Sequence, residues 1–151
     1  MISYLTAKPS RDLIVRAHQQ VTRDWWSRRR RFELYVSDAV LEEAKRGDVA
    51  AAARRRSALK GIPILSASAE AEELALELIR SAVMPSTAAI DAVHVAIAAA
   101  HGLDFLVTWN CAHIANAVMR GKIETACRNA GFRPPAICTP LELPAEGHEE
   151  E

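Results

Sequence analysis

The chain has 151 residues, half of them apolar, which is enough to bury the core of one compact domain without disulfides or metals. Its 19 basic and 19 acidic residues cancel, which excludes a net attraction of the whole chain to nucleic acid or membrane surfaces. The charge is nevertheless divided, because residues 11–60 carry an excess of six positive charges and residues 61–151 an excess of seven negative charges. One part of the chain could therefore face a polyanion while the other supplies carboxylates.

The predicted elements alternate between helices and short strands. Apolar residues at helical spacing predict a first helix after Ser10, which ends in the arginine run at 28–31. The apolar stripe of this helix consists of Leu13, Ile14, Ala17, Val21 and Trp25. A short strand at 34–37 leads into a helix from Asp38, which Gly47 stops. Asp48 is the expected N-cap of the next helix, at 49–59.

The later part of the chain continues this alternation after a brief extended piece at 61–65. The further predicted elements are helices from Ser68 through Ile79, Ala88 to His101, Cys111 to Val118 and Ile123 to Asn129, with strands at 105–108 and 136–139. Strands separated by helices pair in parallel through right-handed crossovers. The sequence therefore predicts an α/β fold, a three-layer α/β/α sandwich with a central, mostly parallel sheet. Residues 1–143 are expected to form one domain, followed by a flexible acidic tail at 144–151.

The cysteines and the uncharged segments bear on the compartment. Cys111, Cys127 and Cys138 form no C-x-x-C pair, which argues against a disulfide framework and a zinc ribbon. The first residues do not have the pattern of a signal peptide, and no uncharged run reaches the roughly 20 apolar residues of a membrane helix. We therefore expect a soluble, cytoplasmic protein with no membrane partner.

Asp91 is the most unusual polar residue, because it lies within the apolar run 88–100. A carboxylate there loses several kcal/mol of hydration unless it lies at a helix start, pairs with a cation or binds a metal. One interpretation is that Asp91 only complements the dipole of a helix that begins near Ser86. His94, one turn later, is expected to be a satisfied, semi-buried histidine rather than a ligand.

Two further candidates follow predicted strands. Glu42 and Glu43 lie on the helix after the first strand, and only one of two adjacent residues can face the sheet. The segment from Thr108 to Asn116 combines a tryptophan, two asparagines and a histidine. Its structural interpretation is that Trp109 packs and Asn110 caps a helix; its functional interpretation is a binding loop.

In parallel sheets, ligands bind beyond the carboxyl ends of the strands, so one of Glu42 and Glu43 can converge with Asp91 and Asn110 on one pocket. Clustered carboxylates require protons or cations, and Mg²⁺ or Mn²⁺ prefers such oxygen ligands. This combination predicts metal-assisted hydrolysis of phosphodiester bonds, in which Thr108, His113 or Ser37 could position phosphate or water. The arginine runs could hold a polynucleotide, or they could be solvated helix faces.

Three stretches, VSDAVLEEAKRG (36–47), IDAVHVAIA (90–98) and LVTWNCAHIAN (106–116), resemble PIN domains, and within them the VapC-type toxins of toxin–antitoxin pairs. The resemblance implies a Mg²⁺- or Mn²⁺-dependent endoribonuclease that cleaves RNA, is often a homodimer and is occluded by a cognate antitoxin. It assigns the catalytic and metal-binding roles to Glu43, Asp91 and Asn110. Glu43 is favoured over Glu42 because the family's acidic residue precedes a glycine by four positions, here Gly47.

The chain departs from the family pattern at two places. Residues 2–6 resemble the part just after the family's first acidic residue, and the strand that ends in that acid is absent; either the start codon is misassigned or the domain is degenerate. Asn110 replaces the usual aspartate, although its carbonyl oxygen could still coordinate a metal. The alternative functions are a catalytically silent PIN module that binds RNA or a protein partner, and a structural oligomerisation domain.

Overall fold

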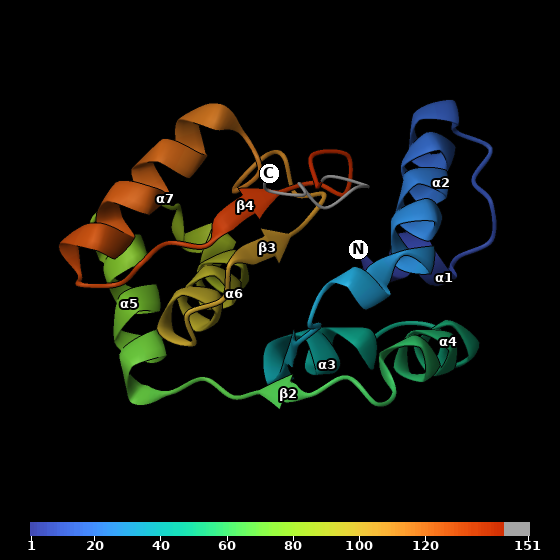
Figure 1. Cartoon of the computed structure of the whole chain (residues 1–151), viewed down its shortest axis with the longest axis horizontal. Coiled ribbons are helices and arrows are strands. Elements are labelled where there is room, and N and C mark those ends of the chain that lie inside the picture. The colour runs from blue at the N-terminus through green and yellow to red at the C-terminus, as the bar shows by residue number, and fades with distance from the viewer. Residues whose placement is uncertain (144–151) are drawn as a thin grey trace, which may run out of the picture.

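The computed structural model describes residues 1–143, which form two halves (Figure 1). The first half contains α1 (Ile2–Thr6), α2 (Leu13–Ser27), the 3₁₀ turn η1 (Arg29–Arg31), β1 (Val36–Ser37), α3 (Asp38–Ala44), α4 (Val49–Leu59) and β2 (Ile64–Leu65). The second half contains α5 (Ala69–Arg80), the 3₁₀ turn η2 (Ser86–Ala88), α6 (Ala89–Ala100), β3 (Phe105–Val107), α7 (Ala117–Asn129) and β4 (Ala136–Cys138). The predicted acidic tail at 144–151 lies outside the described residues.

Several helix starts are set by local capping. The side chain of Asp48 accepts a hydrogen bond from the Ala51 N–H at 2.9 Å, and α4 spans the predicted residues. Ser68 caps α5 in the same way, through the Ala71 N–H at 3.1 Å. Gly47 follows α3 with a φ of 83°, a conformation that favours glycine and reverses the chain toward α4. These local predictions are confirmed.

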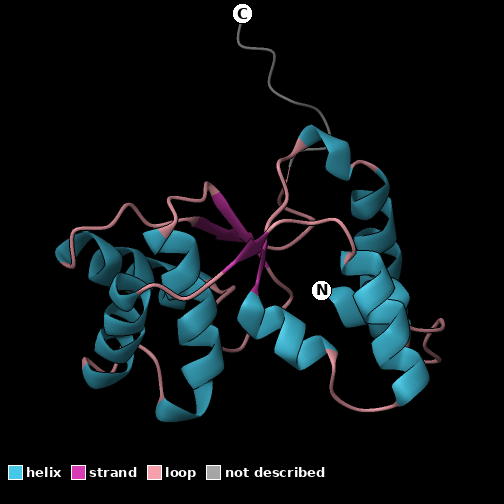
Figure 2. Ribbon diagram, turned by 90° about the horizontal axis from the view of Figure 1, so that it is seen from below, coloured by secondary structure: helices cyan, strands magenta, loops and turns pink. Residues whose placement is uncertain are grey.

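The predicted three-layer sandwich with a central sheet is wrong. Strand β1 pairs in parallel with β2, and β3 pairs in parallel with β4, as two separate two-stranded sheets. Within residues 1–143 no strand pairs with both sheets to join them into one, and the strands have only two or three residues each. The short apolar runs therefore indicated more sheet than the backbone forms, and helices dominate on both sides of the strands (Figure 2).

The main hydrophobic core belongs to the second half. It is built from α5, α6 and α7 together with β4, and its fully buried members include Leu78, Val95, Ile123 and Cys127. Helix α6 is buried on most sides, as its composition predicts. The first half has a much smaller cluster of buried residues, consisting of Val36, Ala44 and Leu59.

Helix α2 is oriented against its own pattern. The first two residues of its apolar stripe, Leu13 and Ile14, are 69% and 70% exposed, whereas polar Gln19 and Thr22 are buried. Gln19 is satisfied by the backbone of the preceding loop, with its Oε1 accepting from the Ser10 N–H at 2.9 Å and its amide donating to the Lys8 carbonyl at 3.1 Å. Hydrogen bonds of Gln19 thus hold the polar side of α2 toward the rest of the molecule.

An aromatic cluster connects the two halves. The indole of Trp109 donates to the Thr22 hydroxyl at 2.8 Å and stacks on His18, with the ring centroids 4.1 Å apart. Tyr4 approaches both rings, at 6.0 and 6.2 Å. Farther along, Phe32 packs edge-on against Phe105 at 6.3 Å. Helix α2 and Phe32, the residue after η1, therefore contact β3 and the loop that follows it.

No helix within residues 1–143 combines the length and apolar character needed to cross a membrane.

Candidate active site

Helix α6 supports the candidate site from its first turn. Asp91 and His94 are three residues apart, so they lie on the same side of the helix. Asp91 is in the first turn, where its charge complements the helix dipole, as the structural interpretation expects. Its carboxylate also makes a specific contact with a distant segment, because Oδ2 accepts a hydrogen bond from the Asn110 amide at 2.9 Å.

Asn110 is held in a tight turn after β3. Its backbone N–H donates to the Thr108 hydroxyl at 3.0 Å, and its Oδ1 accepts from the His113 N–H at 3.2 Å. The Asn110 carbonyl accepts from the N–H groups of Ile114 and Ala115. These bonds use the amide oxygen within the loop and direct the amide nitrogen toward Asp91. Asn110 therefore presents a donor to Asp91, not the oxygen that metal coordination requires.

Glu43 reaches the same helix from the first half of the molecule. Its Oε1 lies 3.2 Å from Nε2 of His94, and the two side chains are 42% and 15% exposed respectively. Ser37 positions α3 for this contact, because its hydroxyl accepts the Val40 N–H at 3.1 Å as the N-cap. His94 is semi-buried, and its carboxylate partner lies 51 residues away in the chain.

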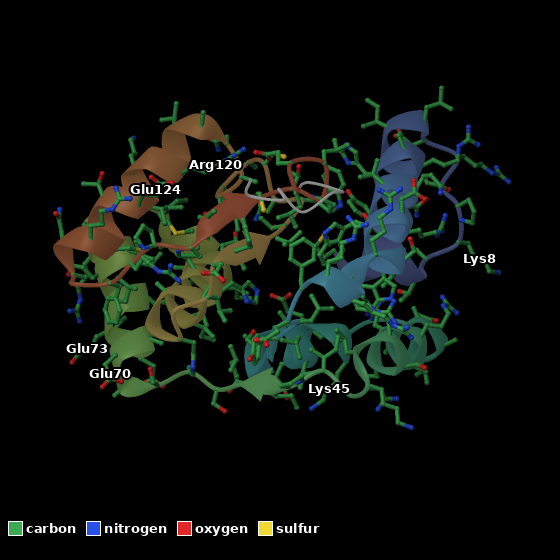
Figure 3. The ribbon with its side chains drawn as sticks, viewed as in Figure 1. Lys8, Lys45, Glu70, Glu73, Arg120 and Glu124 are labelled. Atoms are coloured by element: carbon green, nitrogen blue, oxygen red, sulfur yellow. The ribbon has the colours of Figure 1, made fainter. Side chains whose placement is uncertain are left out.

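The neighbouring Glu42 has a different environment. It is exposed and pairs at 2.8 Å with Lys45, the residue that follows α3. The hydrogen bond from Lys45, with its positive charge, holds the Glu42 pKa below its ordinary value. Figure 3 shows Lys45 at the edge of the molecule beside α3, and it shows Glu70 and Glu73 on the outer side of α5. Of the adjacent pair, only Glu43 therefore contacts the second half.

The donor set limits which ion the site could hold. Within the described chain, Asp91 Oδ1 and Glu43 Oε2 accept no hydrogen bond. No three side chains of His, Cys, Asp or Glu in residues 1–143 lie close enough together to hold a metal ion. Mg²⁺ is commonly bound through one or two carboxylates plus water and substrate phosphate, whereas structural Zn²⁺ requires four protein ligands. Two carboxylates, each with one oxygen that accepts no hydrogen bond, are a donor set that a hydrated Mg²⁺ or Mn²⁺ can use and that a closed zinc site cannot.

The remaining polar candidates are engaged locally. Ser37 caps α3, and the Thr108 hydroxyl accepts the Asn110 N–H. Trp109 belongs to the aromatic cluster, which supports its packing interpretation. Sequence reasoning missed the role of His94 as the link to Glu43. The available signal was its position three residues after Asp91 on a helix that otherwise carries apolar side chains.

No protein-family model, no curated protein and no solved structure matches this chain.

Proposed function

We propose that the protein hydrolyses RNA phosphodiester bonds with Mg²⁺ or Mn²⁺ held by Glu43 and Asp91. The observation that carries the proposal is the convergence on α6, where Asp91 bonds to Asn110 and His94 bonds to Glu43. Three segments far apart in the sequence thereby bring two carboxylates to one flank of a rigid helix.

The chain's own residues supply orientation. A bound divalent ion would lower the pKa of a coordinated water and neutralise charge on the phosphate. The Asn110 amide fixes one oxygen of Asp91, and His94 fixes one oxygen of Glu43. Because each carboxylate is held through one oxygen, the orientation of its second oxygen is set as well. Asn110 acts in this proposal as a positioning residue for Asp91.

The family and the partners belong to the same proposal. The three stretches that contain Glu43, Asp91 and Asn110 resemble VapC-type PIN ribonucleases, and we take the chain to be the toxin of a toxin–antitoxin pair. On this basis we propose a cytoplasmic homodimer whose site a cognate antitoxin covers. The support is the similarity of the site residues, not the arrangement of the strands.

The second candidate is a PIN-like module that binds RNA or a protein partner without cleaving it. It is favoured by the orientation of Asn110, whose amide nitrogen faces Asp91. It is also favoured by the small number of carboxylates, because the contacts on this side of α6 involve two, those of Asp91 and Glu43. Fewer negative charges hold a divalent ion more weakly.

A cleavage assay on single-stranded RNA with Mn²⁺ or Mg²⁺ separates the two candidates. We expect cleavage by the wild-type chain, loss of cleavage in Asp91→Asn and Glu43→Gln, and retention in Glu42→Gln, the matched control one residue away. Asn110→Asp adds a third carboxylate and should raise activity at limiting metal. Binding that weakens with salt but yields no cleavage would favour the silent module. Undiminished cleavage by Asp91→Asn would remove Asp91 from the mechanism.

A further inference from the structure

Four consecutive arginines occupy the junction between α2 and β1. We call residues 28–31 the arginine segment. Arg29, Arg30 and Arg31 form the 3₁₀ turn η1, and Arg28 is the residue that precedes it. Arg28, Arg30 and Arg31 are exposed. Three exposed positive charges therefore lie within four consecutive residues.

The arginine segment is not neutralised by the chain itself. None of its guanidinium groups lies within 4.0 Å of a carboxylate in the part of the chain that the structure describes. The nearby Asp24 instead accepts a hydrogen bond from Gln20 at 2.9 Å. Neighbouring positive charges without a carboxylate partner favour an external anion with several charges.

The second arginine run, on α4, differs. Arg55 donates to the Ala44 carbonyl at 3.1 Å and also to the Arg46 carbonyl, so it ties α4 to the end of α3. Its neighbours Arg54 and Arg56 are exposed on either side of this anchor. The α4 run therefore has a structural explanation that the arginine segment lacks.

The arginine segment also rests on a fixed aromatic support. Arg29 lies over the Trp26 ring, 4.7 Å from its centroid, and donates to the Trp26 carbonyl at 2.9 Å. Trp25 stacks with Phe32 at 6.1 Å, and Phe32 contacts Phe105 at the start of β3. A fixed support lowers the conformational entropy that the arginines lose on binding.

The Phe32–Phe105 contact lies just before both segments that carry residues of the candidate site. The chain runs from Phe32 through β1 to α3, which carries Glu43, and from Phe105 through β3 to Asn110. A polymer held by the arginine segment is therefore beside the two segments that lead to the site.

We propose that Arg28, Arg30 and Arg31 bind the phosphate backbone of single-stranded RNA, with Trp26 as an adjacent stacking surface. This inference rests on the proposed function, because it names the surface that holds the same substrate. Single-stranded RNA is favoured over an anionic lipid surface because it presents both a row of phosphates and flat bases. Grooves that combine basic and aromatic side chains bind such strands without strong sequence preference.

The test measures binding of a fluorescent single-stranded RNA by anisotropy, with EDTA present so that no cleavage occurs. In Arg28→Gln/Arg30→Gln/Arg31→Gln, the slope of log affinity against log salt should fall in magnitude by about two, since each phosphate contact contributes about 0.7. The matched control, Arg54→Gln/Arg56→Gln/Arg128→Gln, removes three exposed arginines elsewhere and should keep the slope. Far-UV circular dichroism should show that both variants are folded.

A second variant probes the aromatic surface. Trp26→Leu should weaken RNA binding by about tenfold without changing the salt slope, because it removes stacking and no charge. An unchanged slope in the arginine variant, or an equal loss in the matched control, would overturn the inference. So would binding to phosphatidylserine vesicles with no binding to RNA.

The outcomes also separate this inference from the proposed function. Specific loss of RNA binding in the arginine variant, with no cleavage by the wild-type chain and Mn²⁺, would support the surface and refute the hydrolase. Cleavage whose KM is unchanged in the arginine variant would support the hydrolase and refute the surface.

Discussion

The two halves of the molecule differ in how they hold their helices together. In the second half, α5, α6 and α7 share one large core whose central side chains, such as Leu78 and Ile123, are fully buried. In the first half, three residues form the buried cluster, and α2 is held largely by hydrogen bonds and aromatic contacts. The second half therefore provides the rigid support, and the first half brings Glu43 and the arginine segment to it.

The largest expected effect comes from truncating the main core. Leu78→Ala removes a fully buried side chain of α5 and should lower the free energy of unfolding by about 2 to 5 kcal/mol. Leu59→Ala, in the small cluster, should have a smaller effect because fewer atoms surround the site. Urea unfolding followed by far-UV circular dichroism measures both variants.

Tryptophan fluorescence sharpens this comparison, because Trp25, Trp26 and Trp109 lie in the first half or against it. Leu59→Ala should shift the fluorescence transition more than the far-UV transition, whereas Leu78→Ala should shift both. A larger loss of stability in Leu59→Ala than in Leu78→Ala would contradict the division into a rigid half and a weakly packed one.

An intermediate effect is expected at the contact between the halves. Trp109→Leu removes the hydrogen bond to Thr22 and the stack on His18, and it should destabilise the docked α2 by about 1 to 3 kcal/mol. Hydrogen exchange should then quicken across α1 and α2 and stay slow across α6. Thr22→Val is the matched variant, since it keeps the side-chain volume and removes the hydroxyl, which accepts from Trp109 and donates to the His18 carbonyl at 2.7 Å. Equal loss of protection in both halves would indicate that they unfold as one unit.

The effect that is smallest at neutral pH concerns two buried thiols of the second half. Burial raises the pKa of Cys127 and of Cys138 from an ordinary 9.0 to about 11, with nearby carboxylates adding to the shift. A raised folded-state pKa means that the unfolded chain loses these protons first, so the contribution of the two thiols to stability should be constant below pH 9 and fall between pH 9 and 11. Urea unfolding against pH measures this fall.

The matched variants for this prediction are Cys127→Ala/Cys138→Ala and Cys111→Ser. The first should lose the alkaline decline attributable to the two thiols, whatever its stability at pH 8, and the second should keep it because Cys111 is exposed. An identical decline in the double variant would show that other groups cause it.

Local signals in the sequence predicted much of the helical structure. Asp48 and Ser68 mark the starts of α4 and α5 because a capping side chain bonds to the backbone three residues later. The prediction failed where packing overrides a local rule. Residues 111–115 form turns organised by Asn110, and α7 then runs without a break through Gly121, a residue that commonly interrupts helices, because Ile123 and Cys127 anchor it in the core.

The sheet and the pairing within the site depend on contacts that a sequence pattern does not contain. Short apolar runs predict strands, but they do not show which strands pair, because pairing depends on contacts between segments far apart in the chain. The sequence singled out Asp91 because a carboxylate is unusual within an apolar run, Glu43 through its spacing to Gly47 in the PIN-like stretch, and Asn110 because it follows a predicted strand. It could not show that His94 contacts Glu43, or that the Asn110 amide turns its nitrogen toward Asp91.

The most direct test of the site that spans the two halves is a titration of the full chain with Mn²⁺, followed by electron paramagnetic resonance. We expect one bound Mn²⁺ in the wild-type chain and in Glu42→Gln, and loss of that ion in both Asp91→Asn and Glu43→Gln. Equal Mn²⁺ binding by all four chains, or no binding by any of them, would contradict the claim that Glu43 and Asp91 hold one ion together.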